Sequence, residues 1–137
     1  ITQAMPTSFK EELLNKEHDL DTDTFKIALY TSSATLDATT TAYSATNEVS
    51  GTGYTAGGAT LASAAITTSG TTAFADFADP SWTSSSFTAN GALIYNSSAS
   101  NKAVAVIAFG GDFTVTTGTF TIVFPAADAS NALIRIA

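Results

Sequence analysis

The sequence contains no cysteine and only one histidine. A chain without thiols has no disulfide framework, no thiolate nucleophile and no cysteine-ligated metal. A single histidine also excludes a metal site built from several imidazoles of one chain. We therefore expect neither a zinc centre nor a catalytic cysteine, and the cellular compartment cannot be inferred from thiol chemistry.

Basic residues are scarce as well, with 5 Lys and Arg against 12 Asp and Glu and a net charge of −7. A surface that binds nucleic acid neutralises phosphates with clustered Lys and Arg. The longest apolar stretches, such as residues 102–109, fall well short of the roughly 20 residues that cross a bilayer. No signal-peptide pattern follows Ile1. We expect no nucleic-acid partner and no membrane partner.

Hydroxyl-bearing and small side chains are abundant instead, with 24 Thr, 15 Ser and 25 Ala among 137 residues. Charged residues make up 12% of the chain, about half the usual share, so hydroxyl groups must solvate much of the surface. The apolar residues suffice for one compact core. We therefore predict a single domain spanning residues 1–137.

One helix is predicted, over residues 8–18. Ser8 followed by Glu11 matches a capping box, in which each side chain accepts a hydrogen bond from a backbone N–H of the other residue. The expected apolar stripe, which would dock on the rest of the fold, consists of Phe9, Leu13 and Leu14. Before this helix, residues 1–6 are expected to form an extended arm.

The rest of the sequence predicts about eight short strands. Phe25, Ile27 and Leu29 alternate with their neighbours in the period of two that is typical of a half-buried strand. The expected strands are 25–30, 60–66, 72–78, 91–96, 102–109, 113–116, 119–124 and 132–136, and turn residues such as Asn90-Gly91, Gly110-Gly111 and Thr117-Gly118 separate several of them. No second helix long enough for a parallel crossover is indicated. The predicted fold is mainly β, an antiparallel β-sandwich or jelly-roll-like barrel with one N-terminal helix.

The least regular segment, residues 31–58, is predicted to be a long interface loop. Ordering so many hydroxyl-rich residues costs conformational entropy that few local contacts offset, so we expect this loop to order chiefly against another subunit. The candidate interface residues are Met5 and Pro6 in the arm and Tyr43, Val49 and Tyr54 in the loop. The alternative is that both tyrosines cover an edge of the sandwich of their own chain.

Few residues are candidates for chemistry. The alternating carboxylates of Asp19, Asp21 and Asp23 resemble part of a calcium loop, but Thr24 and Tyr30 replace the glycine and glutamate of an EF-hand. A solvated acidic linker is the favoured interpretation, with a looser cation site as the alternative. His18 is interpreted as a polar residue at the end of the helix. We predict no catalytic residue, no bound metal and no cofactor.

Five segments carry a resemblance to known proteins. They are Met5–Leu14 (MPTSFKEELL), Asp23–Tyr30 (DTFKIALY), Tyr43–Tyr54 (YSATNEVSGTGY), Gly91–Asn96 (GALIYN) and Ala129–Ala137 (ASNALIRIA). The sequence resembles small structural proteins of tailed bacteriophage virions in these segments. They are distributed along the chain from residue 5 to residue 137, so the resemblance covers nearly its whole length. The resemblance implies a virion component and carries no catalytic residues, and it does not distinguish head from tail.

The leading hypothesis is a non-enzymatic capsid decoration or cement protein. Such a protein would sit on the capsid surface of the virion, bind the major capsid protein or other virion proteins, and form a homo-oligomer, for which we expect a trimer. A tail- or fibre-associated phage protein is one alternative. A carbohydrate-binding module is another, which would use exposed aromatic rings such as Tyr43, Tyr54, Tyr95 or Trp82 as stacking platforms.

Overall fold

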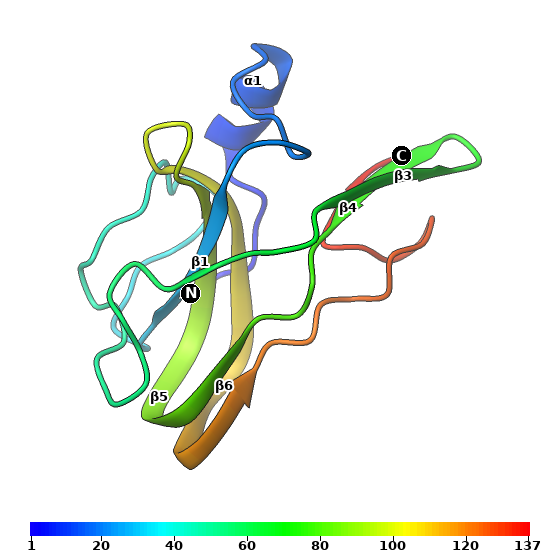
Figure 1. Cartoon of the computed structure of the whole chain (residues 1–137). Helices are drawn as coiled ribbons and strands as arrows, with labels where there is room; N and C mark the ends of the chain where they lie inside the picture. The colour runs from blue at the N-terminus through cyan, green and yellow to red at the C-terminus, as the bar shows by residue number, and fades with distance from the viewer.

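A computed structural model describes residues 1–137 as one short helix and two antiparallel sheets (Figure 1). The elements are α1 (Thr7–Leu14), β1 (Phe25–Tyr30), β2 (Ala59–Thr60), β3 (Ala65–Ser69), β4 (Thr72–Asp76), β5 (Ser81–Asn96), β6 (Lys102–Thr121) and β7 (Ile134–Ile136). The main sheet has the strand order β2-β1-β5-β6 and the small sheet the order β3-β4-β7. The predicted fold class, a mainly β sandwich with one N-terminal helix, is confirmed.

A long, bent hairpin of β5 and β6 dominates the main sheet. The strands have 16 and 20 residues and pair antiparallel along their length, with several breaks in register. At the largest break, Asn90 alone lies opposite residues 109–112. The expected turns at Asn90-Gly91, Gly110-Gly111 and Thr117-Gly118 are therefore wrong, because all three lie inside these strands. Gly110 at the largest break has a φ of 80°, a left-handed backbone conformation that glycine permits in bulges as well as in turns.

The main sheet is buried on both faces. On β1, Phe25, Ile27 and Leu29 point into the larger apolar cluster, whereas Ala28 and Tyr30 point into a smaller one on the opposite face. The larger cluster also receives Phe9 of α1 and the rings of Trp82 and Phe87 of β5, and the smaller one receives Tyr95 of β5, Ile1 and side chains of the segment after β1. β1 is thus a central strand, which explains its nearly continuous burial.

Residues 31–58 pack on both faces of the main sheet, with Leu36 on the smaller cluster and Val49 and Tyr54 on the larger one. The segment has no strand of its own, but isolated bridges join Glu48 to Tyr30, Ala42 to Lys102 and Thr52 to Ser86. Leu36 and Ala34 are buried in the smaller cluster. The expectation that this loop orders chiefly against another subunit is therefore corrected, because its apolar side chains are already packed against its own sheet.

The helix differs from its prediction at both ends. α1 begins directly after Pro6 and ends at Leu14, where Asn15 and the left-handed Lys16 (φ 62°) stop it four residues before His18. The predicted capping box is wrong, since Ser8 lies inside the first turn with its hydroxyl buried and unpaired. Of the expected stripe, Phe9 is buried and Leu13 packs against the core, but Leu14 is 90% exposed.

The N-terminal arm is extended, as predicted, but it lies on its own chain. Ala4 exchanges two backbone hydrogen bonds with Val106 of β6, at 3.1 and 2.9 Å. Pro6 is fully buried, and the side chain of Ile1 packs over Gly91. The predicted availability of Pro6 to a partner is therefore corrected.

The small sheet lies to one side of the main sheet, and the C-terminus lies beside it (Figure 1). Its base joins the larger cluster through Ala75 and Ile134, and Phe77 contacts Phe25 with ring centroids 5.6 Å apart. Farther out, all of β3 is exposed, and Ile66 and Ile136 stand in solvent. The predicted strand 60–66 is therefore divided between β2 of one sheet and β3 of the other.

Candidate functional site

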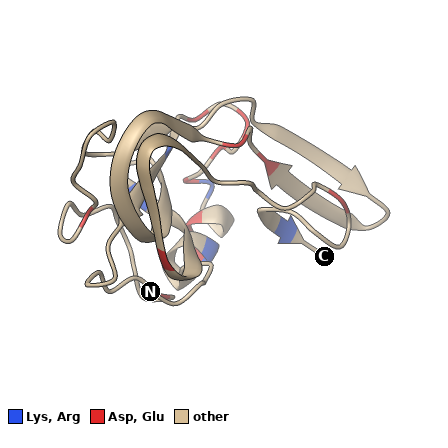
Figure 2. Cartoon of the chain, turned by 90° about the horizontal axis from the view of Figure 1, so that it is seen from below, with Lys and Arg blue, Asp and Glu red and all other residues tan.

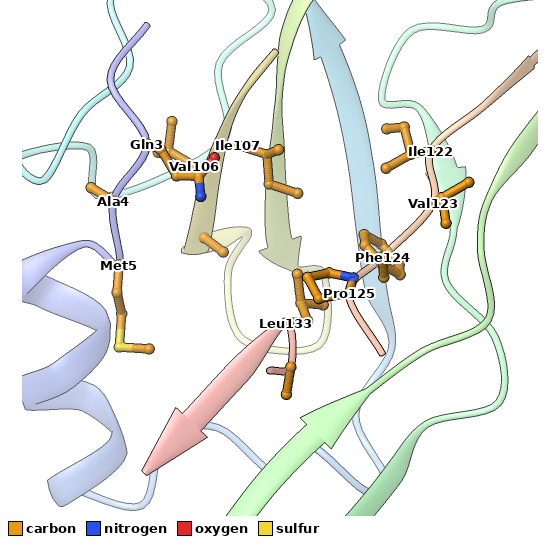
Figure 3. Close-up of a pocket in the computed structure, with 12 residues that line it drawn as sticks. Gln3, Ala4, Met5, Val106, Ile107, Ile122, Val123, Phe124, Pro125 and Leu133 are labelled. Carbon is orange, nitrogen blue, oxygen red and sulfur yellow. The ribbon is translucent and has the colours of Figure 1, made fainter. Parts of the chain in front are cut away.

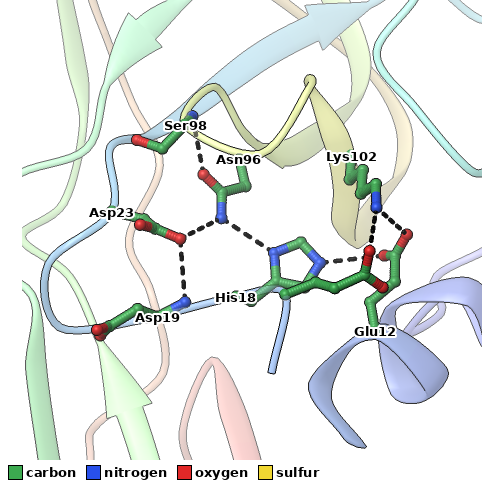
Figure 4. Close-up of polar contacts among 8 residues, drawn as sticks. Glu12, His18, Asp19, Asp23, Asn96, Ser98 and Lys102 are labelled. Atoms are coloured by element: carbon green, nitrogen blue, oxygen red, sulfur yellow. Dashed lines mark hydrogen bonds and ion pairs between the residues drawn. The ribbon is translucent and has the colours of Figure 1, made fainter. Parts of the chain in front are cut away.

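His18 stands at the centre of the most extensive polar cluster (Figure 4). Its Nε2 lies 3.0 Å from Oε1 of Glu12 on α1, and its Nδ1 lies 3.0 Å from Nδ2 of Asn96 at the end of β5. Asn96 also donates to Asp23 at 2.8 Å and accepts from the N–H of Ser98 at 2.9 Å. His18 and Asn96 are both buried. The cluster ties α1 and the segment before β1 to the hairpin of β5 and β6.

The donors and acceptors of this cluster match one another without a vacancy. Asp23 accepts from Nδ2 of Asn96, so the same amide nitrogen faces His18 and donates to its Nδ1. Because Nδ1 accepts from Asn96, Nε2 is the ring nitrogen that donates a hydrogen bond to Glu12. Both ring nitrogens of His18 are engaged within the chain, which leaves neither for a substrate or a metal.

The acidic segment before β1 is also bound to its own backbone. Oδ1 of Asp19 accepts from the N–H groups of Asp21 and Thr22, and Oδ2 of Asp23 accepts from the N–H of Asp19. Nowhere do three or more His, Asp or Glu side chains converge as metal ligands would. Two of the three alternating carboxylates, those of Asp19 and Asp23, thus serve as local hydrogen-bond acceptors.

A second polar cluster surrounds Glu48 in the loop 31–58. Its carboxylate accepts from the hydroxyls of Tyr43 at 2.7 Å and Tyr54 at 2.6 Å, and from the N–H of Gly57 at 2.7 Å. The Tyr54 hydroxyl in turn accepts from the N–H of Leu29 on β1 at 2.9 Å. Burial, together with the hydrogen bond to Glu48, raises the pKa of Tyr43 to about 12 and shifts the pKa of Tyr54 upward as well.

The predicted interface residues of the loop are part of this internal packing. Val49 is buried in the larger cluster, Tyr43 stacks on Tyr95 at 4.7 Å, and Tyr54 packs against the ring of Phe87. The structure therefore corresponds to the alternative interpretation, in which both tyrosines cover the sheet of their own chain. Trp82 and Tyr95 are buried too, which removes two of the stacking platforms that a carbohydrate-binding module would need.

The largest hollow of the molecule, about 620 Å³, is open and partly charged, with Lys16, His18, Asp19 and Asp21 among its lining residues. Another concave surface is apolar. Figure 3 shows a hollow of about 340 Å³ between the N-terminal arm, β6 and the segments after it. Met5 lies on one side of it, Ile107 at its floor, and Phe124 and Leu133 on the opposite side. A second hollow of about 270 Å³ follows along β6 and includes Phe109, Phe113 and Phe120.

The two hollows share Ile107, Ile122 and Val123, so they form one continuous surface, here called the apolar groove. Its lining residues are Gln3, Ala4, Met5, Ala105, Val106, Ile107, Phe109, Phe113, Phe120, Thr121, Ile122, Val123, Phe124, Pro125, Ala132 and Leu133. None of them is charged. Val123 is 76% exposed and Phe113 is 53% exposed. Large exposed apolar side chains of this kind are typical of surfaces that bind another molecule.

The sequence predictions located this surface only in part. Of the five predicted interface residues, Met5 alone lines the groove. The alternation of residues 119–124 was interpreted correctly, since Ile122 and Phe124 are buried and Val123 is exposed. The available signal was Val123 itself, a β-branched apolar residue on the outward face of that pattern. Its neighbours in the groove come from distant segments, which no local pattern connects.

Comparison of the chain with protein-family models, with curated proteins and with solved structures finds no match. No helix of the structure combines the length and apolar composition that crossing a membrane requires.

Proposed function

We propose that this chain is a non-enzymatic structural protein of a tailed bacteriophage virion, a capsid decoration or cement protein that binds the major capsid protein. Two observations support the proposal. Five segments resemble such proteins, and the fold has an uncharged, apolar groove suited to protein contact.

The observation that carries the proposal is the contrast between the polar clusters and the groove. The donors and acceptors around His18 and Glu48 are used within the chain, where they fix loops to strands. The apolar groove has no titratable group, unlike the open hollow beside His18, which is lined by Lys16, Asp19 and Asp21. The groove gains free energy by burial against another protein, either a capsid subunit or a neighbouring copy of the chain in a decorating oligomer.

A second candidate, a tail- or fibre-associated protein, draws on the same resemblance and the same groove. The two roles differ in copy number. A decoration protein binds the many equivalent positions of an icosahedral shell, whereas a tail component binds the much smaller number of equivalent positions in the tail.

Copy number in purified virions of the phage that encodes this chain therefore tests the proposal. Quantitative mass spectrometry against the major capsid protein should give a ratio near that of a shell component. A ratio near that of known tail proteins would favour the second candidate, and absence of the chain from virions would contradict both.

Addition of the purified chain to particles that lack it provides the second measurement. A decoration protein should cosediment with intact shells and saturate at a fixed ratio to the capsid protein. Isolated tails serve as the matched control, and we expect no saturable binding to them.

A further inference from the structure

The outer edge of β6 is open over most of its length. β6 is the last strand of the main sheet, and its outer side is bridged only near its start, by Ala42 at Lys102 and by Ala4 at Val106. Beyond Val106, no strand pairs with this edge. Open edges usually carry Lys, Pro or another device that prevents pairing with a second chain. Residues 107–121 contain no Lys and no Pro, and Asp112 is their only charged residue.

The apolar groove runs beside this open edge. Ile107, Phe109 and Phe113 of β6 line it, and Val123 stands at the junction of its two hollows. A segment that paired with the edge would also cover these side chains. The edge and the groove thus form one surface, which offers backbone hydrogen bonds along the strand and apolar contacts beside it.

Charge determines which partner fits this surface. Each copy of the chain carries a net charge of −7, so two copies repel wherever acidic groups of both approach one another. Half of the acidic residues lie between positions 11 and 23, outside the groove. β5 has no charged residue, and Figure 2 shows how sparse the acidic and basic residues are along the long hairpin. The groove is where two such chains can meet with little repulsion.

We propose that a second copy of this chain covers the apolar groove and the open edge of β6. The occupant is uncharged at the contact, as the groove is, and it supplies an extended strand for the edge. This chain has such strands in β6 itself and in β3, which is fully exposed and has the uncharged sequence AITTS. Two β6 edges meeting give a two-fold dimer, whereas β3 of one copy on β6 of the next gives a ring where the rotation between copies closes and an open filament where it does not.

Self-association of the pure full-length chain tests this inference. Val123→Glu places a charge at the centre of the groove, and Val123 is exposed enough that the monomer should fold unchanged. Leu14→Glu is the matched control, because Leu14 is also exposed but lies outside the groove. Sedimentation velocity over a concentration series should show an oligomer for the wild type and for Leu14→Glu. Val123→Glu should raise the dissociation constant about tenfold or more.

A second variant separates charge repulsion from loss of contact. Phe113→Thr removes an exposed ring without adding charge and keeps a residue that favours strands. It should weaken self-association in the same direction, and far-ultraviolet circular dichroism should show that both groove variants keep the β fold.

A wild-type chain that stays monomeric would overturn the inference, and so would equal weakening by Val123→Glu and Leu14→Glu. If the pure chain is monomeric and Val123→Glu abolishes binding to particles, the groove belongs to the capsid contact instead. The inference builds on the proposed function but fails separately from it. A chain that self-associates through the groove and is absent from virions would contradict only the virion role.

Discussion

At the scale of single residues, Asn96 holds the segment before β1 in place. Its amide donates to His18 and to Asp23 and accepts from Ser98, and the side chain is buried. Removing it leaves a buried imidazole nitrogen without a donor and a carboxylate with one donor fewer. Unpaired buried polar groups are among the costliest defects in a folded protein.

We expect Asn96→Ala to lower the free energy of unfolding by about 2–4 kcal/mol, measured by urea denaturation. Asn90→Ala is the matched control, since Asn90 lies on the same strand and donates to Asp112 at the surface, at 2.9 Å. It should cost less than about 0.5 kcal/mol. Equal effects of the two substitutions would contradict the importance given to the buried cluster.

The tyrosines predict a loss of stability at alkaline pH. Burial raises the pKa of Tyr43 from 10.0 to about 12, and burial also raises the pKa values of Tyr30, Tyr54 and Tyr95. The folded chain therefore keeps protons that the unfolded chain releases. Stability should be fully present below about pH 10 and should fall as the pH rises toward 12.

Denaturation midpoints across this range, together with the ultraviolet absorbance of tyrosinate, measure the effect. Tyr43→Phe removes one of the four titrating groups and should make the fall with pH less steep. If stability stayed constant until all four tyrosines had ionised, the raised pKa values of the folded chain would be contradicted.

At the scale of elements, the N-terminal arm belongs to the fold. Residues 1–6 supply the Ala4 pairing to β6, the hydrogen bond from Thr2 to Leu36 and the buried ring of Pro6. From the sequence, this arm was expected to be extended and to offer Met5 and Pro6 to a partner. Its contacts indicate instead that it stabilises its own chain.

Deletion of residues 1–6 should lower the free energy of unfolding by about 2 kcal/mol or more, because backbone hydrogen bonds and buried apolar area are lost together. Gln3→Ala is the control within the arm. Gln3 is exposed and meets the N–H of Ala108 only at 3.4 Å, so its removal should leave the melting temperature nearly unchanged. If the deletion variant were as stable as the full chain, the arm would not be part of the fold and would be available to contact a partner.

The sequence predicted elements best where large apolar side chains alternate. β1 was predicted with its observed bounds, although it is buried on both faces and not on one, and the burial of Ile122 and Phe124 followed from alternation. No strand was predicted at residues 81–90, which form the first half of β5 and are rich in Ser and Thr around Trp82 and Phe87. That half of β5 is stabilised by its pairing with residues 113–121, far along the chain. Pairing partners contribute the hydrogen bonds of a strand, and a local pattern does not contain them.

At the scale of the whole molecule, the charge distribution predicts that assembly depends little on ionic strength. The apolar groove has no charged lining residue, and Lys102, one of the few cations, is engaged by Glu17 and Glu12. Self-association should therefore change less than about tenfold between low and high salt, because screening has few charge pairs to act upon. Sedimentation at several salt concentrations measures this, and a steep dependence would instead indicate Lys26 or Arg135 as anchors.

The sequence by itself determined the mainly β class, the single N-terminal helix and the acidic, cysteine-free surface, since these follow from composition and from periods that span a few residues. Only the tertiary structure decided that the loop 31–58 covers its own sheet, that His18 meets Asn96, and that the groove lies along β6. Each of these joins residues far apart in the chain, such as Met5 with Leu133. The free energy of such contacts depends on how distant segments pack together, which no local pattern encodes.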